Sequence, residues 1–342
     1  MNVWVIFLVK NNLIKGLEEG IRKIENFEIY SSTDVVVEGL RLLCNAFVYS
    51  SVLDEAIENC ITVVQRLLKA RPTSVMLSNS VRRILEKVNT LLKDGASLDE
   101  LRGMVKEEYN SLVNNMNKAL EAVALMGSKR IDDGDVILTN SYSRTVLTLL
   151  EKAWEKGIRF QVYVVESRPG SEGLFTASYL DNKGIPVTLF VDSAVRFFMK
   201  DVDKVFVGAE AIAANGAVVN KVGTSLIALA AHEARVRVFV VASTLKFSPE
   251  TIFGELVKLM LRPIKRLPER IPVELSEVPA AEFPLFDVTP PEYIDAIITE
   301  RGVVAPEAVI LLVRDIYGWP PRLKKIADIT SELKAMVQGG VK

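Results

Sequence analysis

The residues best suited to chemistry lie in one short stretch, 204–224, which reads KVFVGAEAIAANGAVVNKVGT. An apolar run typical of a buried strand ends in a Gly-Ala pair, and Glu210 follows at once. Asn220 and Lys221 then supply an amide and an ammonium, and a Gly-Thr pair after them opens a helical pattern. A carboxylate and a cation at the carboxyl edge of a parallel sheet suit a small phosphorylated ligand. The stretch therefore predicts a site for such a ligand.

Polar side chains also follow three other predicted strands. Asn140 and Ser141 follow the first, Arg168 follows the second, and Asp192 follows the third. Ligands of open α/β sheets bind where the carboxyl ends of parallel strands meet, so we expect these four residues to converge with those of 204–224. There an arginine can hold phosphate as a two-pronged donor, and a carboxylate can bond sugar hydroxyls or move protons.

Several of these residues also fit ordinary structural roles. Asp192 can be the N-cap of a helix that begins at Ala194, and Arg168 can simply pair with a nearby acid. Asn215 and the glycine after it are typical of a tight turn. Lys221 is harder to explain in this way, because a lysine rarely ends a buried strand without a partner. The order and spacing of the whole set therefore carry the prediction.

Two sequence patterns must position these residues. From about Leu13 to Leu125 apolar residues recur at helical spacing, and the proline-containing segment 71–74 ends one helix and starts the next. After Gly127 short apolar runs alternate with helix-length segments, which predicts βαβ units and a parallel sheet. The predicted fold class is α/β, with a helical N-terminal domain at 1–126 and a Rossmann-like, doubly wound C-terminal domain at 127–342.

Composition limits the classes of function. The chain has 342 residues with 42 Lys+Arg and 43 Asp+Glu, and the net charge of −1 provides no global field that would attract nucleic acid or anionic lipid. Cys44 and Cys60 form no disulfide framework, and we expect two buried thiols. The single histidine, His232, cannot build a zinc site alone. We expect no metal and no cofactor.

Two segments need a separate description. The apolar run at 4–9 is much shorter than the ~20 residues of a membrane-spanning helix and lacks the features of a secretory signal. It fits either a docked strand or an extension from an upstream start. The proline-rich segment 258–282 predicts a loop or excursion. We expect a cytoplasmic protein that contacts no membrane.

The chain resembles the superfamily of initiation factor 2B alpha, beta and delta subunits, ribose-1,5-bisphosphate isomerases and methylthioribose-1-phosphate isomerases. The resemblance covers nearly the whole chain, and from 192 to 249 and again from 286 it is especially similar to the archaeal ribose-1,5-bisphosphate isomerases. Those enzymes convert ribose 1,5-bisphosphate to ribulose 1,5-bisphosphate in nucleotide salvage. Besides 204–224, it rests on Arg71-Pro72-Thr73, Leu138-Thr139-Asn140-Ser141, Glu166-Ser167-Arg168-Pro169, Val191-Asp192-Ser193-Ala194, Lys246-Phe247 and Phe286-Asp287-Val288-Thr289-Pro290.

The resemblance implies a set of ligand-binding residues and an assembly. The set comprises Arg71, Asn140, Ser141, Arg168, Asp192, Glu210, Asn220 and Lys221. Self-association as a dimer or higher oligomer is implied, as are partnership with initiation factor 2 subunits and binding of a small phosphorylated metabolite such as AMP or a ribose phosphate. No direct binding of nucleic acid is expected.

Three departures separate this chain from the isomerase branches. Those branches end a strand in Thr-His-Cys, whose thiol takes part in proton transfer, whereas Ser141 stands here and a serine hydroxyl does not titrate without a dedicated base. Glu210 replaces an aspartate, which displaces the carboxylate by about an ångström, and such a shift can cost on the order of 10² in rate. Residues 30–32 read Tyr-Ser-Ser where the isomerases use Arg-Gly-Ala to hold phosphate.

These departures favour a regulatory reading. The run 140–147 and Glu210 resemble the alpha-type regulatory subunits of initiation factor 2B. We therefore expect a non-catalytic archaeal homologue of that subunit with a residual pocket for a sugar phosphate or nucleotide. The alternative is a ribose-1,5-bisphosphate isomerase or related sugar-phosphate isomerase in which Ser141 and Glu210 are catalytic. A third alternative is a structural partner whose pocket binds nothing.

Overall fold

The computed structural model of the protein describes residues 16–259, 261–263 and 282–338. The predictions for the run 4–9 and for most of the 258–282 segment lie outside these residues. The helices are α2 (Ser32–Val48), α3 (Leu53–Ala70), α4 (Val75–Lys93), α5 (Leu98–Ser128), α6 (Arg144–Glu155), α7 (Glu172–Asn182), α8 (Val195–Phe198), α9 (Thr224–Ala234), α10 (Val309–Tyr317) and α11 (Ile326–Gln338). The strands are β1 (Val136–Thr139), β2 (Gln161–Val165), β3 (Val187–Phe190), β4 (Lys204–Val207), β5 (Ala211–Ala213), β6 (Val218–Lys221), β7 (Arg237–Val241), β8 (Phe247–Ser248), β9 (Leu261–Pro263), β10 (Glu282–Pro284), β11 (Phe286–Thr289), β12 (Ala296–Thr299) and β13 (Gly302–Val304).

The chain forms two compact units. Among the described residues, the helical unit contains 16–122, 243–247 and 311–338, and the sheet unit contains 123–242, 248–259, 261–263 and 282–310. A helical N-terminal region followed by an α/β sheet region confirms the predicted fold class. The domain ranges 1–126 and 127–342 stay a prediction. Within the described ranges, no helix is long and apolar enough to cross a membrane.

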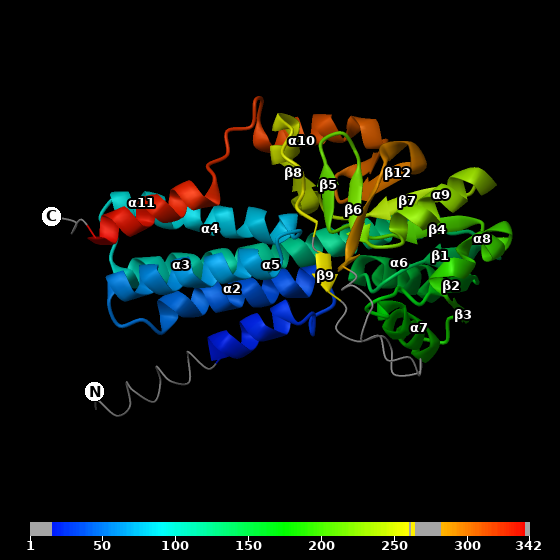
Figure 1. Ribbon diagram of the computed structural model, residues 1–342, viewed down its shortest axis with the longest axis horizontal. Coiled ribbons are helices and arrows are strands. Elements are labelled where there is room, and N and C mark those ends of the chain that lie inside the picture. The colour runs from blue at the N-terminus through cyan, green and yellow to red at the C-terminus, as the bar shows by residue number, and fades with distance from the viewer. Residues whose placement is uncertain (1–15, 260, 264–281, 339–342) are drawn as a thin grey trace. The chain divides into compact units, whose positions relative to one another are not determined.

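One apolar core holds the helical unit together. Leu40 and Phe47 of α2 are fully buried with Leu333 of α11 in the same cluster. Cys44 and Cys60 are free and buried there, as predicted, and burial raises the pKa of the Cys60 thiol to about 12. Helix α11 lies along α4 (Figure 1), so the chain's last described helix belongs to the same bundle as its first ones.

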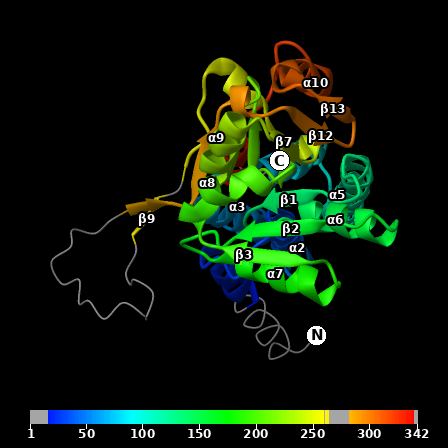
Figure 2. The ribbon, with the colours of Figure 1, turned by 90° about the vertical axis from the view of Figure 1, so that its right-hand side faces the viewer.

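A seven-stranded sheet forms the centre of the sheet unit, in the order β13-β12-β7-β4-β1-β2-β3. Neighbours from β12 to β3 pair in parallel, and β13 pairs antiparallel with β12. Figure 2 shows β1, β2 and β3 side by side. The six parallel strands are β1, β2, β3, β4, β7 and β12 in chain order. If they are numbered 1 to 6, their order across the sheet is 3-2-1-4-5-6, as in a doubly wound fold, so the winding direction reverses between β1 and β4. Ligands of such sheets bind outside the carboxyl ends at this reversal.

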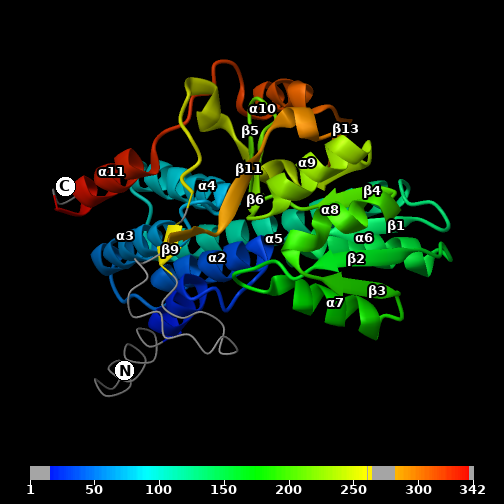
Figure 3. The ribbon, with the colours of Figure 1, turned by 45° about the vertical axis from the view of Figure 1, so that its right-hand side comes forward.

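A smaller antiparallel sheet carries the Asn-Lys pair. Strand β6 pairs with β5 on one side and with β11 on the other, as Figure 3 shows. The turn between β5 and β6 contains Asn215 and Gly216, whose φ of 86° lies in the left-handed region, which confirms the predicted tight turn. Because β6 ends at Lys221, this sheet sets the position of that lysine.

Helix α7 approaches strand β2 more closely than a side chain allows. A Cβ placed on Gly173, the second residue of α7, would lie 1.8 Å from the Val165 carbonyl oxygen at the end of β2. The obstacle is backbone, so it cannot rotate away as a flexible side chain can. Glycine at this position therefore lets α7 begin directly against the carboxyl end of the sheet.

We predict that Gly173→Ala lowers the free energy of unfolding by about 1–3 kcal/mol or more, because the added methyl group forces helix and strand apart. The matched control is Gly103→Ala in α5, where a Cβ would meet nothing within 4 Å. There alanine should raise the free energy of unfolding by about 0.5–1 kcal/mol through helix propensity. Chemical denaturation of both variants measures the difference, and equal effects would contradict the close approach.

Candidate functional site

The reversal of the sheet brings two predicted segments together. Strand β1 pairs in parallel with β4, so Asn140 and Ser141 after β1 lie on the same edge as Glu210 after β4. The side chains of Asn140 and Glu210 are both buried. A Cβ on Gly208 would come within 2.8 Å of Ser143 Oγ, so this glycine permits the close approach of another loop of the protein.

The Thr224 hydroxyl links these segments to the Asn-Lys pair. It accepts hydrogen bonds from Asn140 Nδ2 at 2.9 Å and from Asn220 Nδ2 at 3.0 Å. It also donates to the Lys221 carbonyl oxygen at 2.6 Å. Two side-chain amides from different strands are therefore oriented by one buried hydroxyl at the start of α9. From the sequence, Thr224 was expected only to open a helix.

Asp192 fastens the loop that follows β2. Its carboxylate oxygens accept from the backbone N–H of Ser167 at 3.1 Å and of Arg168 at 3.0 Å. Its Oδ1 also lies 3.8 Å from the position of a Cβ on Gly223, which places it beside the start of α9. Asp192 does not cap the following helix, whose N-cap is Ala194. The interpretation of Asp192 as an N-cap is therefore wrong.

Ser141 has a fixed backbone in an uncommon conformation. Its φ is 58°, its N–H donates to Ser167 Oγ at 2.7 Å, and its carbonyl accepts from Thr176 Oγ1 at 2.5 Å. Ser167 and Ser171 also have positive φ, at 64° and 56°. Residues held in sparsely populated conformations cluster at functional sites, so this edge of the sheet is a candidate site on backbone evidence as well.

Lys221 pairs with an acid that the sequence analysis missed. Its ammonium donates to Glu172 Oε1 at 2.5 Å, and both side chains are less than 10% exposed. The ammonium also lies 5.4 Å from the centre of the Phe286 ring. The sequence indicated only that Lys221, at the end of a buried strand, needs a partner. The sequence could not supply the partner's identity, because Glu172 lies 49 residues earlier in the chain.

Arg168 points its charge toward solvent and a neighbouring acid. Its side chain is 41% exposed and lies 3.8 Å from Glu166, and it donates to Ser171 Oγ at 3.2 Å. The structural alternative that Arg168 pairs with a nearby acid therefore describes its contacts. A role in phosphate binding stays a prediction.

Asp287 occupies the N-terminus of α9. Its Oδ2 accepts from the N–H groups of Gly223 at 2.8 Å and Ser225 at 3.1 Å. Burial raises the pKa of Asp287 to about 6, although these backbone donors act in the opposite direction. A carboxylate thus fills the position where a helix N-terminus would otherwise bind an anion. No role at the site was predicted for Asp287 from the sequence.

Arg71 belongs to the helical unit, whereas the other seven predicted residues belong to the sheet unit. Its guanidinium lies 4.2 Å above the centre of the Phe27 ring, and the side chain is only 2% exposed. In the same unit, Lys246 donates to Ser32 Oγ at 2.8 Å, and Ser31 is the N-cap of α2. The Tyr-Ser-Ser segment stands in place of Arg-Gly-Ala, and its last serine, Ser32, contacts the ammonium of Lys246 from a distant part of the chain.

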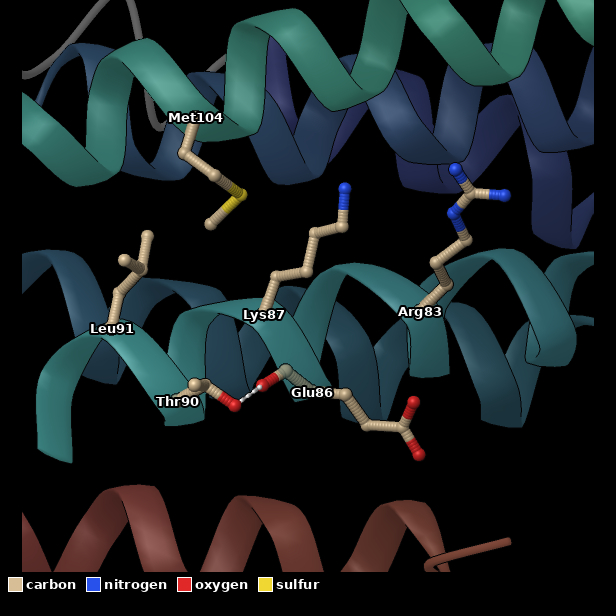
Figure 4. A pocket seen from close by; sticks show the side chains of 6 residues that line it. All are labelled: Arg83, Glu86, Lys87, Thr90, Leu91 and Met104. Atoms are coloured by element: carbon tan, nitrogen blue, oxygen red, sulfur yellow. Dashed lines mark hydrogen bonds between the residues drawn. The ribbon is translucent and has the colours of Figure 1, made fainter.

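A pocket of about 420 Å³ lies in the helical unit between α4 and α5. Figure 4 shows Arg83, Lys87 and Leu91 of α4 and Met104 of α5 pointing into the space between these two helices. The buried carboxylate of Glu108 pairs with both cations. Because these charges compensate one another within the protein, the pocket offers no clear acid–base or anion-binding chemistry.

Among the described residues, no group of three or more His, Cys, Asp or Glu could hold a metal ion.

We predict a pH dependence of stability from Asp287. Its folded-state pKa of about 6 is above the unfolded value of about 3.9, so the folded state holds a proton that the unfolded state releases between these values. This contribution to stability is present below about pH 4 and is lost as the pH rises through 6. Asp287→Asn lacks the titration, so the unfolding free energy of the wild type should fall relative to the variant between pH 4 and 7. Parallel pH profiles in chemical denaturation would contradict this assignment.

Archaeal proteins named ribose 1,5-bisphosphate isomerase match most of the chain. The protein of that name from Thermococcus kodakarensis is 40% identical over 314 residues, which is 90% of this chain and 96% of the relative. The one from Archaeoglobus fulgidus is 43% identical over 256 residues, which is 75% of this chain and 79% of the relative.

These relatives correct the functional reading of the sequence. A non-catalytic regulatory subunit was expected, yet six archaeal relatives that are 36–43% identical carry the isomerase name. The expectation was wrong because it rested on departures at 30–32, 141 and 210, whereas the agreement with these relatives extends over most of the chain. The alternative reading, an isomerase, fits the relatives better.

Solved structures and a family model agree on the wider relationship. The crystal structure of the Pyrococcus horikoshii translation initiation factor eIF-2B matches with a TM-score of 0.73 and 31% identity, covering 86% of this chain and 98% of that one. The model of the initiation factor 2 subunit family matches residues 28–306. With its helical N-terminal region, doubly wound sheet and strand-end residues, this chain belongs to the initiation factor 2 subunit family.

Proposed function

We propose that the protein is a sugar-phosphate isomerase that converts the aldose ribose 1,5-bisphosphate, or a close analogue, to the corresponding ketose. The observation that carries this proposal is the similarity over most of the chain to proteins named ribose 1,5-bisphosphate isomerase. It is supported by the polar cluster at the reversal of the sheet, where ligands of doubly wound folds bind.

The chemistry needs one group that accepts and returns a proton. The ring opens at the bond between C1 and its ring oxygen, the hydrogen of C2 moves to C1, and the C2 hydroxyl becomes a carbonyl. C2 is oxidised and C1 is reduced by the same two electrons, so no external oxidant is required. The C2 hydroxyl loses one proton and the ring oxygen gains one, so the protons balance. A single carboxylate can carry out both transfers.

Glu210 is the residue we assign to this proton transfer. It directly follows β4 at the reversal, its side chain is buried, and its N–H bonds the Val219 carbonyl oxygen at 2.8 Å. Ser141 lies on the same edge with its backbone fixed by Ser167 and Thr176. A serine hydroxyl does not titrate in the neutral range, so we assign Ser141 to orienting the substrate by hydrogen bonding.

Two buried cations belong to the helical unit. Arg71 and Lys246 are both buried there, and Lys246 contacts Ser32 at the start of α2. A role of Arg71 in phosphate binding stays a prediction from the resemblance.

Self-association is supported by apolar surface at one edge of the sheet unit. Leu189 on the edge strand β3, Val191 and Phe197 are 43%, 53% and 65% exposed. Exposed apolar side chains on an edge strand fit a second copy of the chain. Binding of AMP and partnership with initiation factor 2 subunits stay predictions from the resemblance, and a cytoplasmic location stays a prediction from the sequence.

We predict that the purified protein converts ribose 1,5-bisphosphate to ribulose 1,5-bisphosphate, as followed by NMR. Glu210→Gln should lower kcat at least 10²-fold, because proton transfer by a positioned side chain contributes about 10²–10⁴. The control is Glu151→Gln, which removes the ion pair of α6 with Lys183, the residue after α7, and should keep wild-type turnover. Absence of ketose with wild-type protein, or full activity of Glu210→Gln, would refute the proposal.

A second pair of variants tests Ser141. Ser141→Ala should lower kcat by no more than about tenfold, because only an orienting hydrogen bond is lost. Ser141→Cys should raise kcat and add a new ionisation near neutral or mildly alkaline pH to the rate profile, because a thiol can titrate there. A complete loss of activity in Ser141→Ala would mean that the hydroxyl itself moves protons.

A further inference from the structure

The pocket between α4 and α5 has the size of a ligand site. The described residues that line it all belong to these two helices of the helical unit, as Figure 4 shows. Its volume of about 420 Å³ falls within the range of about 300–1,000 Å³ that is typical of ligand pockets. None of the strand-end residues of the candidate site lines it, so a molecule bound here would occupy a separate site.

Apolar side chains form much of the wall of this pocket. Leu91 of α4 and Met104 of α5 both line it, and both are partly buried against the core of the helical unit. Thr90 donates its hydroxyl proton to the Glu86 carbonyl oxygen at 3.0 Å, so this proton is already used within α4. A methionine side chain is flexible and adapts to irregular shapes. The wall therefore suits an aliphatic or aromatic group.

A buried carboxylate keeps two long cationic side chains from covering this wall. Glu108 of α5 is only 5% exposed, and it pairs with both Arg83 and Lys87 of α4. Lysine and arginine side chains otherwise tend to lie along apolar surface with their methylene groups. A buried charge without its partners is strongly unfavourable, so the two cations stay at Glu108. Leu91 and Met104 consequently remain accessible from the pocket.

The same ion pairs define the polar end of the pocket. Arg83 contacts Glu108 through Nε, and within the described ranges no acceptor meets its two terminal nitrogens. Its side chain points into the space between the helices (Figure 4). The two cations, Arg83 and Lys87, are balanced by the carboxylates of Glu86 and Glu108, so no net charge favours an ion. The pocket thus provides hydrogen-bond donors for a neutral acceptor.

We propose that this pocket binds a neutral molecule with an apolar body and one hydrogen-bond acceptor, such as an amide or an alcohol. The apolar body contacts Leu91 and Met104, and the acceptor receives a hydrogen bond from Arg83. Glu108 is a positioning residue, because it holds Arg83 and Lys87 at the end of the pocket. The site lies outside the proposed isomerase chemistry and does not depend on it.

The first test uses the full chain with isotope-labelled methionine methyl groups and three probes that share a cyclohexane ring. Cyclohexanecarboxamide is neutral, cyclohexanecarboxylate is an anion and cyclohexylammonium is a cation. The amide should shift the NMR resonance of the Met104 methyl group saturably, with a dissociation constant in the millimolar range expected for so small a ligand. The resonance is assigned by its absence from Met104→Leu.

The two charged probes should bind at least fivefold more weakly than the amide, because each loses hydration in a pocket whose own charges are balanced. Tighter binding of the carboxylate than of the amide would overturn the proposal. An unshifted Met104 resonance at saturating amide would do the same. No step measures isomerisation, so these outcomes are independent of the proposed activity.

A blocking variant tests the position of the ligand. Met104→Trp places a larger ring in the pocket and should abolish amide binding, as measured through the NMR signals of the amide itself. The matched control is Asn110→Trp, which adds the same ring at an exposed position of α5 and should keep the wild-type dissociation constant. Equal amide binding by the two folded variants would contradict the assigned site.

Glu108→Gln tests the positioning role. This variant keeps the side-chain size but releases Arg83 and Lys87, which then cover the apolar wall. The amide should bind at least fivefold more weakly, whereas the carboxylate should bind more tightly than to the wild type. A mere loss of stability would not produce that gain. Unchanged binding of both probes by folded Glu108→Gln would overturn the role of Glu108, and the wild-type titration decides the site if this variant does not fold.

Discussion

The parallel pairing of β1 with β4 is the constraint on which the candidate site depends. These two strands are separated by more than sixty residues in the chain, yet their pairing brings the ends of both to one edge. The reversal of winding there leaves space outside the strands that no crossover helix covers, which is why doubly wound sheets bind ligands at this point. The residues at this edge then hold one another. Thr224 orients two amides, Asp192 fastens the loop after β2, and Asp287 closes α9.

This mutual support explains why so many polar groups can be buried at one place. A buried polar group is costly unless it finds a partner, and most of those here find backbone N–H groups or neighbouring side chains. The exceptions, such as Glu172 Oε2 and Asn140 Oδ1, are therefore informative. Thr139 Oγ1 and Asp287 Oδ1 also lack a hydrogen-bond partner in the described part of the chain, so unsatisfied oxygens are spread over several segments of this edge. A preorganised network of this kind also binds without reorganising, which favours recognition of a rigid sugar.

Much of the fold could be predicted from the sequence, because buried parallel strands are short apolar runs that alternate with helix-length segments. The alternation predicted after Gly127 appears as the parallel strands β1, β2, β3, β4 and β7 with helices between them. Residue types at the candidate site were predicted as well. Their partners were not, because packing between segments 24 to 84 residues apart decides that Asp192 holds Arg168 or that Thr224 holds Asn140. Helix α11 was missed, since nothing local indicates that it packs on α4.

The error about function has the same origin. Reading Ser141, Glu210 and residues 30–32 one at a time treats each as an isolated group, whereas a site works through the sum of its charges and donors. A proton shuttle needs one titratable group on the correct edge, and Glu210 remains one. Lys246 contacts Ser32 at the start of α2 from more than two hundred residues away, so a cation lies beside the Tyr-Ser-Ser segment although its arginine is missing. Substitutions that remove a motif locally can thus be compensated by residues that only the fold brings together. The loss of a motif is therefore weaker evidence against an activity than its presence is evidence for one.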